Sequence, residues 1–272
     1  MNEYNALIVG LGRVGQGSGY YAIPGNSHLS ALIETKKYQI FGTDKTSIQN
    51  QNLTYMSWNN LITSDVKFDL IVDCASSDGR FERLNILNQI FNPKILLSEK
   101  PIGLGWEEST SELLNKVRLT YPRRCFVSTK LIKNEILKNS IRNISVKYNN
   151  GVFNALSHFF DLLSCWGISF KEDLVCLNAT EVSIGGKIHV TKDNSNLDVF
   201  DITIEFVNGN KLFYNDFGRV IIDCNRDVHR FCELDHRYRF IYTNNNFLEL
   251  PTIKEDFRNM SVLKKLSDLL ND

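Results

Sequence analysis

The stretch Gly10-Leu11-Gly12-Arg13-Val14-Gly15 decides how the first half of this chain folds. It follows the short apolar run at residues 6–9, so the glycines stand at the end of a predicted buried strand. Gly10 permits a tight turn, Gly12 lets another molecule approach the backbone, and Gly15 permits close packing of a helix on the strand. The same spacing occurs where a strand–turn–helix unit holds a pyrophosphate. The stretch predicts a dinucleotide-binding loop or, alternatively, a glycine-rich turn of another α/β fold.

Apolar runs and helical patterns alternate over the first half of the chain. Strands are expected at residues 6–9, 38–42, 69–74, 94–97 and 125–128. Helices are expected between them, at residues 28–35, 79–90 and 107–120. The strand runs are apolar without alternation, as in parallel strands that are covered on both faces. The pattern predicts an α/β domain over residues 1–125, with the doubly wound parallel sheet of the Rossmann fold.

The pattern changes over residues 126–272. A basic connector at 130–142 leads to an amphipathic segment at 154–166, and further strand runs follow without helices between them. These runs are residues 179–184, 199–206, 211–214, 220–223 and 238–242. Asn208-Gly209 separates two of them, which is a hairpin signal. Strands in series predict a second, smaller α+β domain with a mostly antiparallel sheet. A terminal helix at 253–270 is expected to pack back on the first domain.

The composition excludes several classes of protein. Thirty-one basic residues balance 31 acidic ones, so no overall charge attracts nucleic acid or an anionic membrane. No apolar run approaches the roughly 20 residues that span a bilayer, and the chain opens on a strand pattern instead of a targeting segment. The six cysteines include no closely spaced pair, so reduced thiols are expected. These features predict a soluble, cytoplasmic protein with neither a nucleic-acid nor a membrane partner.

Asp44 is the candidate for binding the ribose of a dinucleotide. An acidic residue usually stands about 20 residues after the glycines. The longer spacing here is explained by residues 17–25, whose glycines and proline are expected to interrupt the first helix or extend the loop. A carboxylate at this place repels a 2′-phosphate, whereas Lys45, Thr46 and Ser47 offer groups that bind one. The expected cofactor is NAD or NADP, with NAD favoured.

Ser98-Glu99-Lys100-Pro101 follows the predicted strand at 94–97. Open α/β sheets bind ligands at the carboxyl ends of their strands, and Pro101 restricts the turn there. An ammonium group at this edge can hydrogen-bond a substrate oxygen and stabilise charge as hydride moves. Taken alone, Glu-Lys-Pro is more often a solvated loop, so its interpretation depends on the rest of the chain.

The glycine loop, the strand-end Glu-Lys-Pro and a later helix with a histidine together resemble the Gfo/Idh/MocA oxidoreductases, the family of glucose–fructose oxidoreductase and inositol dehydrogenase. The resemblance is good over residues 5–122. It implies that Lys100 lies at both nicotinamide and substrate, and that a sheet face of the second domain forms a homo-oligomer, a dimer or tetramer. The expected cofactor-binding residues are Gly10, Gly12, Arg13, Val14, Gly15, Asp44, Ala75, Ser76, Glu99 and Lys100.

His158 is the candidate acid/base residue. The segment at 151–158 resembles the family segment in which an aspartate precedes a histidine by four residues, and here Asn154 holds the place of the aspartate. Helical spacing puts a polar stripe opposite an apolar face. The stripe is Asn154, His158, Asp161 and Cys165, and the apolar face is Phe153, Leu156, Phe160 and Leu163. The alternative is an ordinary amphipathic helix whose polar face meets water.

Other polar residues have weaker functional interpretations. Relatives carry an arginine after the sixth strand, and Lys130 or Lys133 is the candidate here. Strand alternation at 238–242 would place Arg237 and Arg239 on one face, either for a phosphorylated substrate or in water. His28 opens a helix, with Ser27 as its possible cap, and would lie near the cofactor phosphates.

Together these features predict an NAD(P)-dependent oxidoreductase that moves a hydride between nicotinamide and a hydroxyl or keto carbon of a sugar, cyclitol or sugar nucleotide. Lys100 would polarise the reacting oxygen and His158 would exchange its proton. Asn154, Asp161 and Lys130 are the expected substrate-binding residues. The alternatives are a dinucleotide-binding sensor or scaffold without catalysis, and an unrelated Rossmann reductase of a small carbonyl compound.

Overall fold

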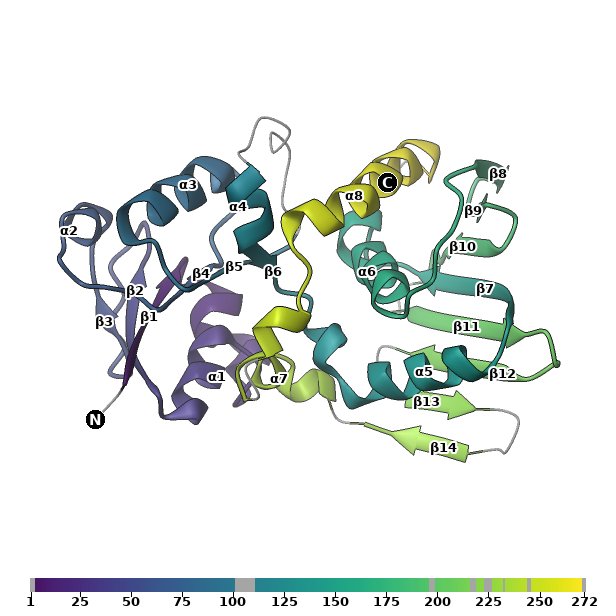
Figure 1. The fold of residues 1–272 in the computed structure, drawn as a ribbon, viewed down its shortest axis with the longest axis horizontal. Helices are drawn as coiled ribbons and strands as arrows, with labels where there is room; N and C mark the ends of the chain where they lie inside the picture. The colour runs from purple at the N-terminus through teal and green to yellow at the C-terminus, as the bar shows by residue number, and fades with distance from the viewer. Residues whose placement is uncertain are drawn as a thin grey trace. The chain divides into compact units, whose positions relative to one another are not determined.

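The computed structural model describes residues 3–100, 111–195, 199–215, 219–222, 227–231, 233–243 and 246–270. Two compact units make up the chain, and Figure 1 labels their helices and strands. The first unit contains residues 1–122 and 235–255, and the second contains residues 123–234 and 256–272. The chain therefore returns to the first unit after it has formed most of the second.

The first unit is built on a six-stranded parallel sheet. Its strands are β1 (Tyr4–Val9), β2 (Tyr38–Thr43), β3 (Thr54–Tyr55), β4 (Leu70–Asp73), β5 (Ile95–Ser98) and β6 (Val117–Leu119). Their order is β3-β2-β1-β4-β5-β6, and every neighbouring pair is parallel. This order, which reverses at β1, confirms the predicted doubly wound sheet. The central strands are apolar and buried because helices cover both faces of the sheet.

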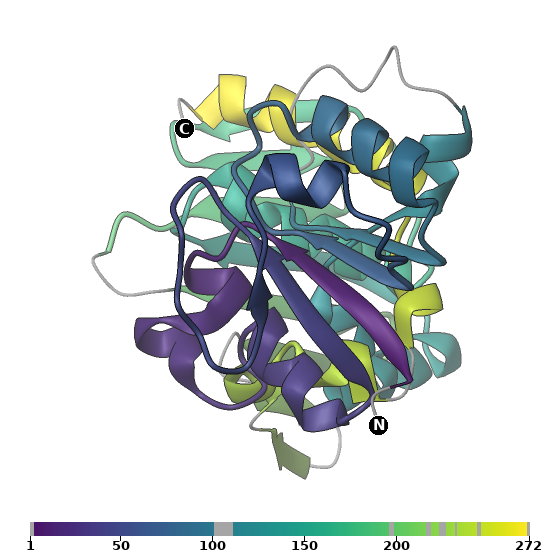
Figure 2. The same ribbon diagram turned by 90° about the vertical axis from the view of Figure 1, so that its left-hand side faces the viewer.

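Helices pack on both faces of this sheet (Figures 1 and 2). On one face lie α3 (Arg80–Phe91) and α4 (Ser111–Lys116), and on the other lie α1 (His28–Thr35) and α7 (Arg239–Thr243). The short helix α2 (Trp58–Ile62) follows β3. The predicted strand at 238–242 is wrong, because that run lies at and within α7. Its aromatic residues favour a strand, but Tyr238 and Tyr242 are buried beside α1, and this packing overrides the local preference.

The last strand of the first domain was expected at 125–128, and this prediction is wrong. β6 is Val117–Leu119, which falls inside the helix expected at 107–120; residues 107–110 of that helix lie outside the described residues. Residues 122–125 instead form the turn η4 (Pro122–Cys125), and α5 (Val127–Lys138) follows. A strand of three residues is too short to show a period of its own. It is completed by the distant residue Thr252, which bridges to Arg118.

The second unit contains an eight-stranded sheet. Its strands are β7 (Ile141–Tyr148), β8 (Leu174–Asn178), β9 (Glu181–Ile184), β10 (Ile188–Lys192), β11 (Phe200–Phe206), β12 (Lys211–Asn215), β13 (Arg219–Ile222) and β14 (Asp227–Arg230). Their order is β14-β13-β12-β11-β7-β10-β9-β8, and all pairs except β7–β10 are antiparallel. The mostly antiparallel sheet and the hairpin between β11 and β12 are thus confirmed. Asp223, in the strand expected at 220–223, lies outside the described residues.

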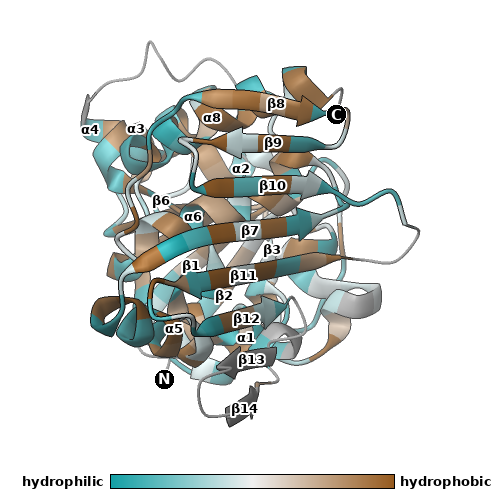
Figure 3. Cartoon of the chain, turned by 90° about the vertical axis from the view of Figure 1, so that its right-hand side faces the viewer, coloured by the Kyte–Doolittle hydropathy of each residue, from teal (hydrophilic) through white to brown (hydrophobic). Residues whose placement is uncertain are grey.

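Apolar and polar residues alternate along β11, a central strand of this sheet, which Figure 3 colours by hydropathy. In β11 every second residue from Phe200 to Phe206 is buried, and the residues between them are not. The buried face packs on α6 (Ser157–Cys165) and on α8 (Ile253–Leu270). Each large apolar side chain buried in this way contributes about 1.5–3 kcal/mol. The helix expected at 253–270 is confirmed; its first three residues belong to the first unit, and Val262, Leu263, Leu266 and Leu270 lie in the core of the second.

The basic connector expected at 130–142 is for the most part the helix α5, and residues 141–142 begin β7. Among the described residues, no helix is long and apolar enough to cross a membrane. The same part of the chain brings no three metal-ligating side chains together.

Candidate functional site

A cleft of about 700 Å³ lies at the carboxyl ends of β1, β2 and β4 in the first unit. Its walls come from the glycine loop, the end of β2, and the loop and helix that follow β4. The lining residues are Val9, Gly10, Gly12, Thr43, Asp44, Lys45, Trp58, Cys74, Ala75, Ser76, Asp78, Gly79, Glu82, Arg83 and Ile86. Five expected cofactor-binding residues, Gly10, Gly12, Asp44, Ala75 and Ser76, thus come together. Arg13, Val14 and Gly15 are not among the residues that line the cleft.

The three glycines of the loop have different structural roles. Gly10 has φ +86°, and a Cβ there would lie 2.5 Å from the backbone nitrogen of Ala75. A Cβ on Gly15 would lie 2.0 Å from the carbonyl oxygen of Gly10. A Cβ on Gly12 would meet no atom within 4 Å, although Gly12 lines the cleft. Gly10 and Gly15 are therefore required by packing, whereas Gly12 leaves space open in which a ligand can approach the backbone.

The loop does not continue into a long helix. It forms the π-helical turn η1 (Arg13–Gly17) and the 3₁₀ turn η2 (Gly19–Ala22), and α1 begins only at His28. Ser27 caps α1 in a capping box with Ser30. The predicted interruption of the first helix is therefore present. A phosphate at this loop would bind mainly to backbone N–H groups, because no long helix follows whose dipole could attract it.

Asp44 is held against the glycine loop. Its Oδ2 accepts a hydrogen bond of 2.5 Å from the backbone N–H of Leu11, and its carbonyl oxygen accepts one of 3.1 Å from the Tyr55 hydroxyl. Lys45 also lines the cleft. The carboxylate is therefore fixed at the cleft wall, where it can accept hydrogen bonds from a ribose.

Two arginines at the start of α3, which no sequence motif indicated, organise the loop after β4. Arg83 donates to the buried carboxylate of Asp73 at 3.0 Å and to the Ser76 carbonyl at 2.8 Å. Arg80 is buried and donates to the carbonyl oxygens of Ala75 at 2.6 Å and Glu99 at 2.7 Å. Burial raises the pKa of Asp73, although the two guanidinium groups act to lower it. Arg80 thus joins the cleft wall to the peptide that precedes Lys100.

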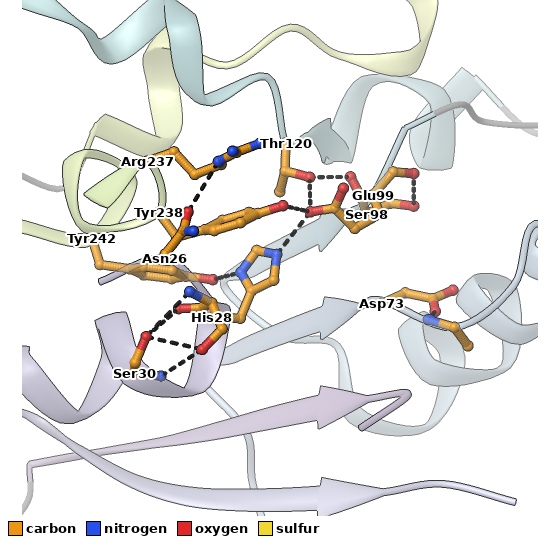
Figure 4. A network of polar contacts seen from close by, with 12 residues as sticks. Asn26, His28, Ser30, Asp73, Ser98, Glu99, Thr120, Arg237, Tyr238 and Tyr242 are labelled. Carbon is orange, nitrogen blue, oxygen red and sulfur yellow. Dashed lines mark hydrogen bonds and ion pairs between the residues drawn. The ribbon is translucent and has the colours of Figure 1, made fainter. Parts of the chain in front are cut away.

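Glu99 belongs to a buried polar network (Figure 4), which is hereafter called the Glu99 network. Its Oε1 accepts hydrogen bonds from His28 Nε2 at 2.9 Å, Thr120 Oγ1 at 2.6 Å and Tyr238 Oη at 2.9 Å. The other ring nitrogen of His28, Nδ1, lies 2.5 Å from the Tyr242 hydroxyl. Burial acts to raise the pKa of Glu99, but these donors outweigh it and hold the pKa below its ordinary value. Glu99 therefore carries a stable negative charge.

This network changes the interpretation of two predicted residues. His28 was expected near the cofactor phosphates, but it is fully buried between Glu99 and Tyr242. Glu99 was expected to bind cofactor, but it is not among the residues that line the cleft. His28 and Glu99 are 71 positions apart in the sequence, and His28 and Tyr242 are 214 positions apart. No local sequence pattern therefore predicts these contacts.

Lys100 is the second residue after β5 and is half-buried at the carboxyl edge of the parallel sheet. It is a residue of the first unit. Pro101, which was expected to restrict the turn, lies outside the described residues.

The predicted residues of the histidine helix lie in the second unit. His158 is half-buried in α6, Asn154 is exposed in the π-helical turn η5 (Val152–Leu156), and Lys130 is exposed on α5. The predicted polar stripe is wrong in part, since Asp161 is buried and Phe153 is 36% exposed. A π-helical turn has a longer period than an α-helix, so a stripe drawn at 100° per residue does not pass through it unchanged.

Asp161 pairs with Arg124, and this pair corrects a second expectation. The distance from Arg124 Nε to Asp161 Oδ1 is 2.6 Å. Because β6 ends at Leu119, Arg123 and Arg124 are the basic residues that follow the sixth strand. Two arginines therefore follow the sixth strand, before Lys130 and Lys133, which were the candidates for this place. Burial raises the pKa of Asp161 to about 7, helped by the charge of Asp256 and opposed by that of Arg124.

The buried Asp161 carboxyl is expected to make stability depend on pH. Its ordinary pKa is 3.8 and its folded pKa is about 7, so the folded state binds the proton more tightly. This stabilisation is complete below about pH 4 and is lost as the pH rises to about 7, by at most about 4 kcal/mol. Urea unfolding of the wild type and Asp161→Asn over this range measures it, and the variant should lack this part of the pH slope.

The matched control for that experiment is Asp173→Asn, which changes an exposed aspartate of the same unit. It should keep the wild-type slope. Equal slopes in the wild type and Asp161→Asn would contradict the assignment of the titration to Asp161.

The basic stretch around residue 237 does not form the predicted strand face. Arg237 donates to Asn26 at 3.0 Å, and Arg239 forms two hydrogen bonds with Glu34, of 2.6 and 2.8 Å. Both arginines are thus joined to the α1 region of the first unit. The predicted strand face, whether for a phosphorylated substrate or in water, is therefore wrong.

No protein-family model matches the chain, and no curated protein matches its sequence. Solved structures do resemble it over nearly their whole length. A myo-inositol dehydrogenase from Corynebacterium glutamicum has a TM-score of 0.69 at 11% identity, with 100% of this chain and 97% of that chain covered. The WlbA dehydrogenase from Bordetella pertussis, solved with NADH and UDP-GlcNAcA, has a TM-score of 0.69 at 14% identity, with 100% and 96% covered.

A third similar structure is a super-repressor mutant of Gal80p from Saccharomyces cerevisiae, with a TM-score of 0.70 at 13% identity and with 98% of this chain and 96% of that chain covered. At these identities the likeness shows the fold. The myo-inositol dehydrogenase and WlbA are dehydrogenases of the Gfo/Idh/MocA type, so the two-part fold that the sequence resemblance implied is confirmed.

Proposed function

We propose that the chain is an NAD(P)-dependent oxidoreductase that moves a hydride between nicotinamide and a hydroxyl- or carbonyl-bearing carbon of a sugar-type substrate. The observation that carries the proposal is the cleft at the glycine loop, in which Gly12 leaves its space open beside the fixed carboxylate of Asp44. The dehydrogenase fold of the similar structures supports it. A homo-oligomer and a cytoplasmic location stay predictions from the sequence.

The residues of the cleft fit a dinucleotide. Its volume of about 700 Å³ is that of a cofactor site. Gly12 and the neighbouring loop would hold the pyrophosphate, Asp44 would accept hydrogen bonds from the adenosine ribose, and Ala75 and Ser76 would form the opposite wall. When bound, the cofactor supplies the nicotinamide that accepts or donates the hydride.

We assign the chemistry to the polar side chains that the sequence patterns and the family resemblance indicated. The ammonium group of Lys100 would hydrogen-bond the reacting oxygen and stabilise negative charge on it. The imidazole of His158 would take the hydroxyl proton in oxidation and return it in reduction, because its ordinary pKa is near neutrality. The Asn154 amide and Lys130 would bind neighbouring substrate oxygens. Asp161 is buried against Arg124, so we assign it to holding α6 in place.

A second candidate function is a dinucleotide-binding sensor. Asn154 stands where the family has an aspartate, and one similar structure is a repressor mutant, Gal80p. Sugars, inositols and sugar nucleotides assayed with NAD and NADP, by the absorbance of reduced nicotinamide, separate the two functions. Turnover of any substrate supports the enzyme. Tight NAD binding without turnover of any of them supports the sensor.

Neutralising Asp44 is expected to change the cofactor preference. Asp44→Asn keeps an oxygen that can accept from Leu11 but loses the charge. A charged hydrogen bond contributes about 1.5–3 kcal/mol, so the Kd for NAD should rise at least about tenfold, while that for NADP should fall because the 2′-phosphate is no longer repelled. Calorimetric titration with each cofactor measures both constants. Asp65→Asn, at an exposed aspartate of the same unit, is the control, and an unchanged NAD to NADP ratio in Asp44→Asn would refute the role.

A further inference from the structure

The Glu99 network gives one carboxylate oxygen three hydrogen-bond donors. They come from three elements that are far apart in the sequence: His28 from α1, Thr120 from the segment after β6, and Tyr238 from the segment before α7. Figure 4 shows these side chains converging on Glu99. Such a set of donors is stabilising only while Glu99 is an anion that accepts all of them. The network therefore holds the carboxylate in one place and in one charge state.

The hydrogen bonds also settle which protons the network holds. Burial raises the pKa of Tyr238 and Tyr242 well above the ordinary value, so both hydroxyls keep their protons. Since the Glu99 anion can only accept, His28 Nε2 carries a hydrogen. The other ring nitrogen, Nδ1, lies at hydrogen-bond distance from the Tyr242 hydroxyl, so Tyr242 holds the second side of the His28 ring. Tyr242 thus orients His28, and His28 orients Glu99.

The backbone on either side of Glu99 is fixed as firmly as its side chain. The Glu99 N–H donates to the Asp73 carbonyl at 2.9 Å, and the Glu99 carbonyl accepts from the buried Arg80 at 2.7 Å. The Ser98 carbonyl accepts the Thr120 N–H at 2.9 Å. The peptide group that joins Glu99 to Lys100 is therefore held by buried partners. Lys100 leaves the sheet from a fixed point.

We infer that His28 is a positioning residue for Lys100, which it orients through Glu99. The inference rests on the proposed function of Lys100. Removing the His28 donor would let the Glu99 carboxylate turn or take up a proton, and the first atoms of Lys100 would lose their fixed direction. A reacting group displaced by about 1 Å can cost about 100-fold in rate.

The first test compares two replacements of His28 and reads kcat and KM separately. His28→Leu removes the donor and is expected to lower kcat about 10- to 100-fold, with the KM for NAD unchanged because His28 does not line the cleft. His28→Gln keeps an amide N–H near the place of Nε2 and should restore most of kcat. Equal kcat values in the two variants would overturn the inference. If His28→Leu fails to fold, Tyr238→Phe removes one donor to Glu99 and replaces it in the comparison.

The second test asks whether His28 acts through Glu99. Glu99→Gln already replaces the carboxylate that accepts the His28 hydrogen bond. The double variant His28→Leu/Glu99→Gln should therefore have the same kcat as Glu99→Gln alone. Multiplied losses in the double variant would overturn the inference. The control is Ser30→Ala, which weakens the capping box of α1 without touching Glu99. It should lower the melting temperature and leave kcat unchanged, which separates a loss of stability from a loss of position.

A third readout does not depend on turnover. Lysines are dimethylated with ¹³C, and the Lys100 resonance is identified by its absence from the Lys100→Arg spectrum. His28→Leu and Glu99→Gln should move this resonance, and Ser30→Ala should not. An unmoved resonance in both variants overturns the inference, even if the wild type is active. If the wild type turns over no substrate but the resonance moves, the proposed function fails and the positioning by His28 stands.

Discussion

Replacing Lys100 by methionine is expected to lower kcat by about 10³-fold. Methionine keeps most of the length of the side chain and removes the ammonium group, so the reacting oxygen loses its charged hydrogen-bond donor. The loss of one such donor at an oxygen that gains charge costs about 10²–10³ in kcat. The absorbance of NADH during turnover measures kcat. The affinity for NAD, measured by calorimetry, should stay unchanged because other residues line the cleft.

Lys94→Met is the matched control for this prediction. Lys94 lies just before β5, its side chain is 73% exposed, and it pairs with Asp69 at 2.8 Å. Exposed pairs of this kind contribute about 0–1 kcal/mol to stability, so this variant should keep the wild-type kcat. Lys100→Met with near-normal kcat would remove Lys100 from the proposed mechanism.

Replacing Gly15 by alanine is expected to lower the free energy of unfolding by about 3 kcal/mol, a large part of the stability of an ordinary domain. The new Cβ would lie 2.0 Å from the Gly10 carbonyl oxygen, and the backbone would have to move to admit it. Because that backbone forms the cleft wall, NAD binding should weaken as well. Urea unfolding measures the stability, and calorimetry measures the binding.

Gly12→Ala has the opposite expected profile and serves as the matched comparison. A Cβ at this position would meet no protein atom within 4 Å, so stability should change by less than about 0.5 kcal/mol. The methyl group would instead enter the space assigned to the pyrophosphate, and the Kd for NAD should rise about tenfold or more. Equal stability losses in Gly12→Ala and Gly15→Ala would contradict the separate roles given to these glycines.

Features with a local cause were predictable from the sequence. Each of these features depends on neighbouring residues: the glycine loop, the strands β1, β2, β4 and β5, and the hairpin at Asn208-Gly209. Five cofactor-binding candidates were also brought together, since strand ends in a parallel sheet meet at one edge.

Features that depend on distant partners were not predictable. β6 has three residues and pairs with β5 on one side and Thr252 on the other, so its own sequence still shows a helical pattern. Tyr238 and Tyr242 have strand-forming neighbours, yet burial beside His28 decides their conformation. The ion pair of Asp161 with Arg124 was not predicted, because the strand was expected to end at residue 128. Arg124 was therefore not considered as a residue that follows the strand.

The return of residues 235–255 to the first unit has a consequence for synthesis of the protein. A ribosome makes the glycine loop and β1 first, but Tyr238 and Tyr242 are made only near the end of the chain. Until then the carboxylate of Glu99 lacks a donor and His28 lacks its tyrosine partner. The nascent first unit therefore stays incompletely paired until residues 235–255 have emerged, and its last hydrogen bonds form only after most of the second unit has been synthesised.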